Sequence, residues 1–106
     1  MEDAPDKPNP TGFINLSKKL LGDNLEASNI PIAYVGDTIA DINTVVNARK
    51  VLPTQKFISI GISPPHLHLK SRLKERNSYE KNLRDAGADL ILNSIYELKD
   101  INLNLL

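Results

Sequence analysis

The chain has 106 residues, which is the length of one compact domain. Its 13 Lys and Arg residues balance its 13 Asp and Glu residues, so no net charge draws it to nucleic acid or to an acidic membrane. Its apolar runs are shorter than the roughly 20 residues that span a bilayer. The N-terminal segment lacks the basic and apolar regions of a secretion signal. We expect one cytoplasmic domain over residues 1–106, without a nucleic-acid or membrane partner.

The N-terminal third predicts a polar lead-in followed by a helix. Residues 1–8 are polar and contain two prolines, so we expect an extended segment there. Asn9 can cap a helix, Pro10 suits its first position, and Gly22 can end it. The apolar stripe of this predicted helix is Phe13, Leu16 and Leu20.

Two short apolar runs predict strands separated by a helix. Residues 30–35 are β-branched or aromatic in part, with Pro31 and Gly36 marking the bounds of the run, which suits a strand buried on both faces. Residues 41–50 carry apolar side chains at helical spacing, and the sequence FISIGI within residues 56–62 predicts the second strand.

The C-terminal half repeats the alternation. A longer helix is predicted over residues 69–86, with Gly87 as its terminator, then a strand over 88–92. Ser94 can cap a final helical turn over 95–99. The expected inward residues of the longer helix are Leu69, Leu73, Tyr79, Leu83 and Ala86. Helices between short apolar strands imply a parallel sheet with right-handed crossovers. The predicted class is therefore α/β, Rossmann-like in the broad sense, with about three strands and flanking helices.

Two carboxylates follow the first predicted strand, in the sequence YVGDTIAD. Gly36 permits a tight turn, Asp37 comes just after the strand, and Asp41 begins the next helix. Functional groups of parallel sheets gather at the carboxyl ends of the strands, and Mg²⁺ prefers carboxylate oxygens. These residues predict either a charged helix start or a metal site. Thr38 would bind phosphate or simply cap the turn.

A lysine upstream favours the metal interpretation. Lys7 precedes Pro8-Asn9-Pro10, a rigid turn into the first helix. Its ammonium could balance clustered carboxylates and bind phosphate as a point charge.

Together these motifs resemble the haloacid dehalogenase (HAD) superfamily. Lys7-Pro8-Asn9-Pro10 and IPIAYVGDTIADI are similar to its third and fourth motifs, and FISIGIS and LRDAGADLILNSIYELKDI are similar to its closing segments. The resemblance implies that Lys7 steadies the nucleophile and the transferred phosphoryl group, that Asp37 ligates Mg²⁺ and that Asp41 supports the metal. Gly36 would hold the turn. It also implies hydrolysis of a small phosphomonoester through an aspartyl-phosphate.

The resemblance covers only the C-terminal part of that family. The Asp-x-Asp motif that supplies the nucleophile in the family has no counterpart here, since Asp3 and Asp6 follow no apolar strand. We therefore expect a weak Mg²⁺ half-site, an inactive isolated chain and an open edge on the 32–35 strand. Such an edge invites self-association or a partner chain. The alternative is a non-catalytic HAD-like binding module that pairs through this edge.

The remaining polar candidates favour ordinary structural roles. His66 and His68 form a pair that could bind zinc or nickel, yet loop histidines are the simpler interpretation. Ser63 either borders the pocket or caps the Pro-Pro turn. A basic run is expected to be a solvated helix face: Lys70, Arg72, Lys74 and Arg76.

Overall fold

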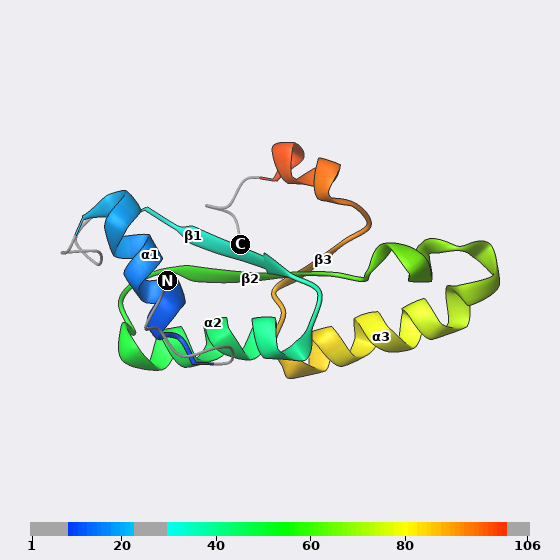
Figure 1. Ribbon diagram of the computed structural model, residues 1–106, viewed down its shortest axis with the longest axis horizontal. Coiled ribbons are helices and arrows are strands. Elements are labelled where there is room, and N and C mark those ends of the chain that lie inside the picture. The colour runs from blue at the N-terminus through cyan, green and yellow to red at the C-terminus, as the bar shows by residue number, and fades with distance from the viewer. Residues whose placement is uncertain (1–8, 23–29, 102–106) are drawn as a thin grey trace.

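The computed structural model describes residues 9–22 and 30–101. Three parallel strands form one sheet in the order β1-β2-β3, with β1 at Ile32–Gly36, β2 at Phe57–Ile62 and β3 at Leu90–Leu92. Helices connect the strands, so the predicted α/β class with three parallel strands is confirmed (Figure 1). Each observed strand ends within one residue of its predicted end and begins one or two residues later than predicted. The expected lead-in, residues 1–8, lies outside the described residues.

The central strand is β2, and β1 is an edge strand. β2 is buried along Phe57–Gly61, whereas every residue of β1 is only half-buried. The expectation that this first strand would be buried on both faces was therefore wrong. The reason is that a short apolar run looks alike at the centre and at the edge of a sheet. Among the described residues, no strand lies beside the outer edge of β1.

Three α-helices cover one face of the sheet, and the second and third of them join consecutive strands. They are α1 at Thr11–Leu21, α2 at Ile39–Val51 and α3 at Leu73–Ala86. α2 and α3 run along the same face of the sheet in Figure 1. A core of Ile14, Val45, Ala48 and Phe57 packs α1 and α2 against the sheet. This packing follows from the alternation of side chains along a strand, because Phe57 points to the opposite face from Ile58.

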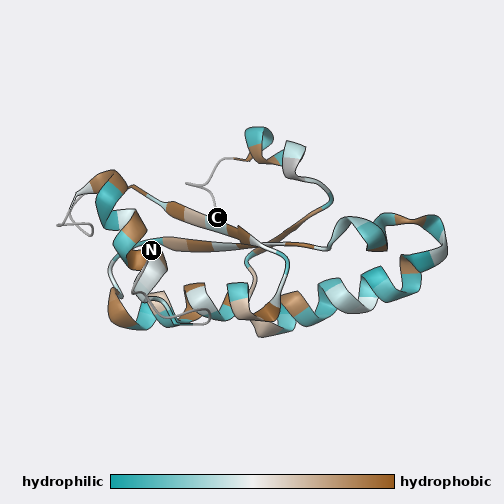
Figure 2. Cartoon of the chain, in the orientation of Figure 1, coloured by the Kyte–Doolittle hydropathy of each residue, from teal (hydrophilic) through white to brown (hydrophobic). Residues whose placement is uncertain are grey.

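The other face is covered by a short 3₁₀ helix, η4, at Ile95–Asp100. Its Leu98, together with Ile101, packs against a second core of Ile58, Ile60 and Leu92. Ser94 caps η4 in a capping box with Glu97, as the sequence predicted. Figure 2 shows that hydrophobic residues concentrate in the sheet while α3 is mainly hydrophilic.

The apolar faces of two helices differ from those expected. Leu69 and Leu73 are more than half exposed, because the chain forms 3₁₀ turns at Pro65–His68 and Lys70–Arg72 before α3 begins. The helical spacing therefore does not carry across residues 69–73. On α1, Leu16 and Leu20 are exposed.

The face of α1 that packs inward holds Ile14 and Ser17 instead. Asn9 still serves the start of α1 by accepting a hydrogen bond from the Thr11 backbone N–H at 2.9 Å, although the helix begins one residue later than expected. Within the described ranges, no helix is long and apolar enough to cross a membrane.

Hydrogen bonds to the Asp89 carboxylate hold the amino ends of β2 and β3 together. The Asp89 carboxylate accepts from the Ser59 N–H at 2.8 Å and from the Arg49 guanidinium at 2.6 Å. Arg49 also donates to the Phe57 carbonyl at 2.8 Å. α2 is thereby tied to both strands at the end of the sheet opposite the candidate site.

Candidate functional site

The two predicted carboxylates lie at the carboxyl end of β1, and Asp41 is the buried one. Its side chain is 3% exposed, and its Oδ2 accepts from the Thr38 N–H at 3.1 Å, the Thr38 hydroxyl at 2.8 Å and the Asp37 N–H at 3.2 Å. Thr38 in turn accepts from the Asp41 N–H at 3.1 Å, so the pair forms a capping box at the start of α2. Thr38 and Asp41 therefore both stabilise the start of α2.

Tyr34 and Gly36 complete the surroundings of Asp41. The Tyr34 hydroxyl donates to Asp41 Oδ1 at 3.1 Å, and its ring meets the Phe13 ring edge-on at 5.0 Å between centroids. Gly36 lies directly under the carboxylate, since a Cβ built there would sit 2.3 Å from Asp41 Cβ. Only a glycine lets the Asp41 side chain fold over the end of the strand. The sequence indicated the turn at Gly36 but not this reason for it.

Asp37 differs from Asp41 because its side chain is exposed. No described residue bonds to its carboxylate; its backbone N–H donates to Asp41, and its carbonyl oxygen accepts from the Tyr79 hydroxyl. Burial raises the pKa of Tyr79, and the charges of Asp37 and Asp41 raise it further. Tyr79 thus stays protonated and can keep donating to the loop that presents Asp37.

These residues fit half of a magnesium site. Asp37 offers one free carboxylate, whereas Asp41 holds the loop through its own hydrogen bonds. In the part of the chain that the structure describes, no group of three or more His, Asp or Glu side chains is placed to hold an ion. Mg²⁺ commonly takes one or two carboxylates together with waters and substrate phosphate. The Asp37 carboxylate is compatible with such a site, but alone it would bind the ion weakly. Lys7, the predicted partner of the transferred phosphoryl group, lies outside the described residues.

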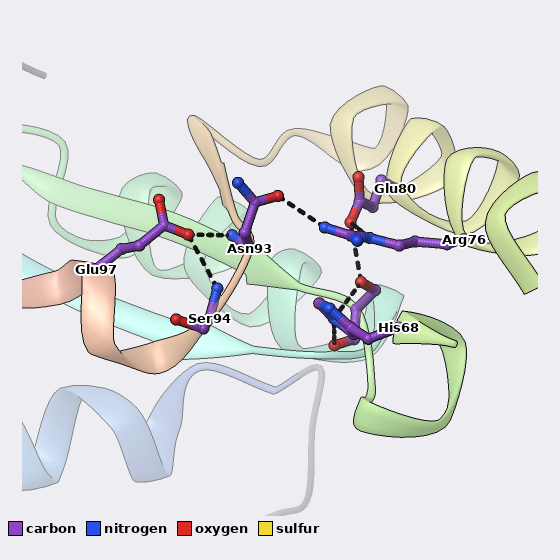
Figure 3. Close-up of polar contacts among 7 residues, drawn as sticks. His68, Arg76, Glu80, Asn93, Ser94 and Glu97 are labelled. Atoms are coloured by element: carbon purple, nitrogen blue, oxygen red, sulfur yellow. Dashed lines mark hydrogen bonds and ion pairs between the residues drawn. The ribbon is translucent and has the colours of Figure 1, made fainter. Parts of the chain in front are cut away.

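A second polar cluster lies across the carboxyl ends of β2 and β3 (Figure 3). The Ser63 hydroxyl lies 2.9 Å from Glu80 Oε2 and 3.0 Å from His68 Nε2. Arg76 donates to Glu80 at 2.9 Å and to the Asn93 side-chain oxygen at 2.7 Å. We call these five residues the strand-end network. It joins α3 to the ends of two strands.

The surroundings of Arg76 in the strand-end network differ from those expected, and most of the network was not predicted from the sequence. Arg76 was expected on a solvated face, yet its side chain is only 20% exposed and pairs with Glu80. Arg72 does pair in the open with Glu75. His68 contacts the Ser63 hydroxyl and carbonyl oxygen through its Nε2, and the preference for loop histidines over a zinc or nickel site stays a prediction. The only sequence signal for the Arg76–Glu80 pair was its i, i+4 spacing.

The Glu80 carboxylate is the electrostatic centre of this network. Burial raises its pKa, but the hydrogen bonds from Arg76 and Ser63 and the charges of Arg76 and Arg84 outweigh burial and lower the pKa below its ordinary value. A carboxylate with a lowered pKa in the folded state stabilises the fold above its unfolded pKa. That contribution is lost as the pH falls through the folded-state pKa.

We therefore expect Glu80→Gln to lower the free energy of unfolding by about 2 kcal/mol at neutral pH. The difference from the natural chain should shrink as the pH falls from about 4.5, the ordinary pKa of a glutamate, through the lower pKa of folded Glu80, where its carboxylate becomes neutral. Urea unfolding at several pH values measures both effects. Glu75→Gln is the matched control, because its pair with Arg72 is solvent-exposed and should matter little. A difference independent of pH would contradict an electrostatic role for Glu80.

Two hollows lie near the carboxyl end of β1, and Asp37 lines the smaller of them. An open groove of about 850 Å³ runs along the outer edge of β1 and is lined by Leu16 and Leu20 of α1 and by Ala33 and Val35. We call it the β1 groove. A smaller cavity of about 370 Å³ is lined by Asp37 and by residues at the carboxyl ends of β2 and β3. The exposed Asp37 carboxylate therefore belongs to the wall of the smaller cavity, while the β1 groove begins at its neighbours Val35 and Thr38.

Searches against family models, curated proteins and solved structures find no match to the chain.

Proposed function

We propose that the chain forms the C-terminal portion of a cytoplasmic HAD-like phosphatase and carries the magnesium-binding half of its active site. The observation that supports this most is the free carboxylate of Asp37 at the carboxyl end of an edge strand. Parallel α/β sheets bind ligands at the carboxyl ends of their strands. The nucleophile and the other reacting groups would be supplied by a strand that pairs beside β1. The substrate would be a small phosphorylated molecule.

The described residues would position rather than react. Gly36 makes room for Asp41, and Asp41 with Thr38 fixes the backbone that presents Asp37. Mg²⁺, when bound, would neutralise charge on the phosphate. Asp37 would bind that ion, and Lys7 would bind the phosphoryl oxygens, as the resemblance implies. No nucleophile is assigned, so the isolated chain should hydrolyse p-nitrophenyl phosphate slowly or not at all.

The groups needed for the reaction would be brought by a strand beside β1. Among the described residues no strand pairs with the outer edge of β1, and Leu16 and Leu20 leave apolar surface along the β1 groove. A strand paired in this groove would bury that surface and end close to Asp37. The same edge suits self-association or a separate partner chain.

Paramagnetic Mn²⁺ tests the metal half-site without requiring activity. We expect Mn²⁺ to broaden the amide NMR signals of residues 36–38 first, with millimolar Mg²⁺ competing. Asp37→Asn should abolish this broadening, because it removes the only free carboxylate of the described loop. Asp85→Asn, on the exposed face of α3, should leave it unchanged. Equal broadening in Asp37→Asn would contradict the site, as would phosphatase activity with Mg²⁺ that survives this substitution.

A non-catalytic binding module is the second candidate. The observation that favours it is that Asp41 and the Thr38 hydroxyl are bound to one another rather than free for a metal or phosphate. In that case the β1 groove would bind a partner and Asp37 would be an ordinary surface carboxylate. Mn²⁺ would then broaden no residue of the 36–38 loop preferentially, so the same titration separates the two functions.

A further inference from the structure

The smaller cavity beside Asp37 has a composition of its own. It holds about 370 Å³, which lies within the range of small-molecule sites. The apolar part of its wall is Ile62, Pro64 and Pro65, and the polar part is Asp37, Ser63, His68, Asn93 and Ser94. Its walls come from the carboxyl ends of all three strands. This is the edge at which parallel α/β sheets bind their ligands.

The strand-end network fixes the walls of this cavity. The Ser63 carbonyl oxygen can only accept, so the contact at 3.1 Å means that His68 Nε2 carries a hydrogen and donates. The Ser63 hydroxyl then accepts from His68 and donates to Glu80. Neutral His68 therefore keeps an unprotonated Nδ1. Two successive prolines stiffen the same wall.

Asn93 fixes the opposite wall and keeps a donor. Its side-chain oxygen accepts from Arg76 at 2.7 Å, and its backbone N–H donates to Glu97 at 2.6 Å. Its side-chain NH₂ remains able to donate to a ligand. Figure 3 shows Asn93 held between Arg76 and Glu97. The cavity wall is thus organised before any ligand arrives, which reduces the entropic cost of binding.

The charges around the cavity limit what it can bind. Among the described residues, none that lines the cavity is Lys or Arg, and the negative Asp37 carboxylate disfavours an anionic group inside it. Proline and isoleucine side chains offer a flat apolar surface, and the carboxylate accepts hydrogen bonds. We propose that this cavity binds a neutral aromatic or heteroaromatic ring that carries a hydroxyl or N–H donor.

This inference deepens the proposed function and rests on it for its biological meaning. If the phosphoryl group lies beside the Mg²⁺ that Asp37 would bind, the cavity would receive the alcohol part of the substrate, and the preferred phosphomonoester would carry a compact neutral ring. The charged phosphate itself would stay outside the cavity. Asn93 would be a specificity residue of that site.

Phenol is the probe that tests this inference, and it requires neither metal nor activity. In a titration without Mg²⁺ at about pH 8, where an ordinary histidine is neutral, we expect saturable shifts of the amide signals of residues 62–63, 68 and 93–94. The dissociation constant should be in the millimolar range, as for other small fragments. Benzoate, a ring of similar size with a negative charge, should bind at least about tenfold more weakly because Asp37 repels it.

Two variants connect the binding to the cavity. Asn93→Ala should weaken phenol binding about fivefold through loss of one hydrogen bond. Asn77→Ala, on the exposed side of α3, should not. Phenol shifts confined to the β1 groove, no saturable shift at residues 62–63 and 93–94, or equal binding of benzoate would each overturn the inference. Because no Mg²⁺ is present, these results are independent of the Mn²⁺ test, and either proposal can fail alone.

Discussion

Gly36→Ala should lower the free energy of unfolding by about 3 kcal/mol, because the new methyl group has no space. Its Cβ would lie 2.3 Å from Asp41 Cβ, 2.5 Å from Cγ and 2.6 Å from Oδ2. Asp41 Cβ is fixed to the backbone of α2, so the side chain cannot simply turn away. The helix start must shift, and the capping box with Thr38 is lost with it. Urea unfolding followed by far-UV circular dichroism measures the change.

Gly61 provides the matched control for this substitution. It pairs with Gly36 in the register of β1 and β2, so both positions share one row of the sheet. A Cβ at Gly61 would approach the ends of two flexible side chains, Ile91 at 2.9 Å and Leu83 at 3.1 Å. These can move, so Gly61→Ala should cost about 1 kcal/mol. Equal effects at the two glycines would show that the clash with Asp41 is not decisive.

The contrast between these glycines shows how far local sequence patterns extend. The spacing Gly-Asp-Thr-x-x-Asp predicted a turn followed by a helix, and the structure has both at Gly36 and Thr38. Gly87 ends α3 with a positive φ of 123°, as a terminating glycine should. Such features depend on neighbours within four residues, so they can be predicted from the sequence.

Features that depend on distant partners were not predictable in this way. The β1 run is apolar enough to be central, and only the strand order shows that it is at the edge. Leu69 and Leu73 fit a helical stripe, but the turn after Pro64-Pro65 leaves them in solvent. Arg76 meets Asn93 across 17 residues of chain. No local periodicity encodes that contact.

The same distinction applies to the candidate site. The sequence brought Asp37 and Asp41 together as possible metal ligands, and the structure places both at the end of β1. The structure also gives them different surroundings, with one carboxylate exposed and the other bonded to its own helix start. Spacing alone could not separate these roles, because a capping aspartate and a ligating aspartate occupy the same sequence positions.

Asp41→Ala should lower the free energy of unfolding by about 3 kcal/mol. It removes the acceptor for the backbone N–H groups of Asp37 and Thr38 and for the Tyr34 hydroxyl, in a place that is almost fully buried. Asp41→Asn should cost only about 1 kcal/mol. Its amide oxygen can accept from the N–H groups, while its NH₂ can donate to Tyr34. Asp85→Ala on the surface of α3 is the control, and urea unfolding of the three variants is the measurement.

The asparagine variant also decides what Asp41 does for the metal. If Asp41 only positions the loop, Asp41→Asn keeps the backbone in place and Mn²⁺ should still broaden residues 36–38 through Asp37. If Asp41 ligates the ion directly, the broadening should decrease in Asp41→Asn, because this substitution removes the charge of the carboxylate. The hydrogen bonds around Asp41 favour the first outcome, because three donors already face Oδ2. Loss of broadening in a variant that remains folded would assign Asp41 to the metal as a ligand.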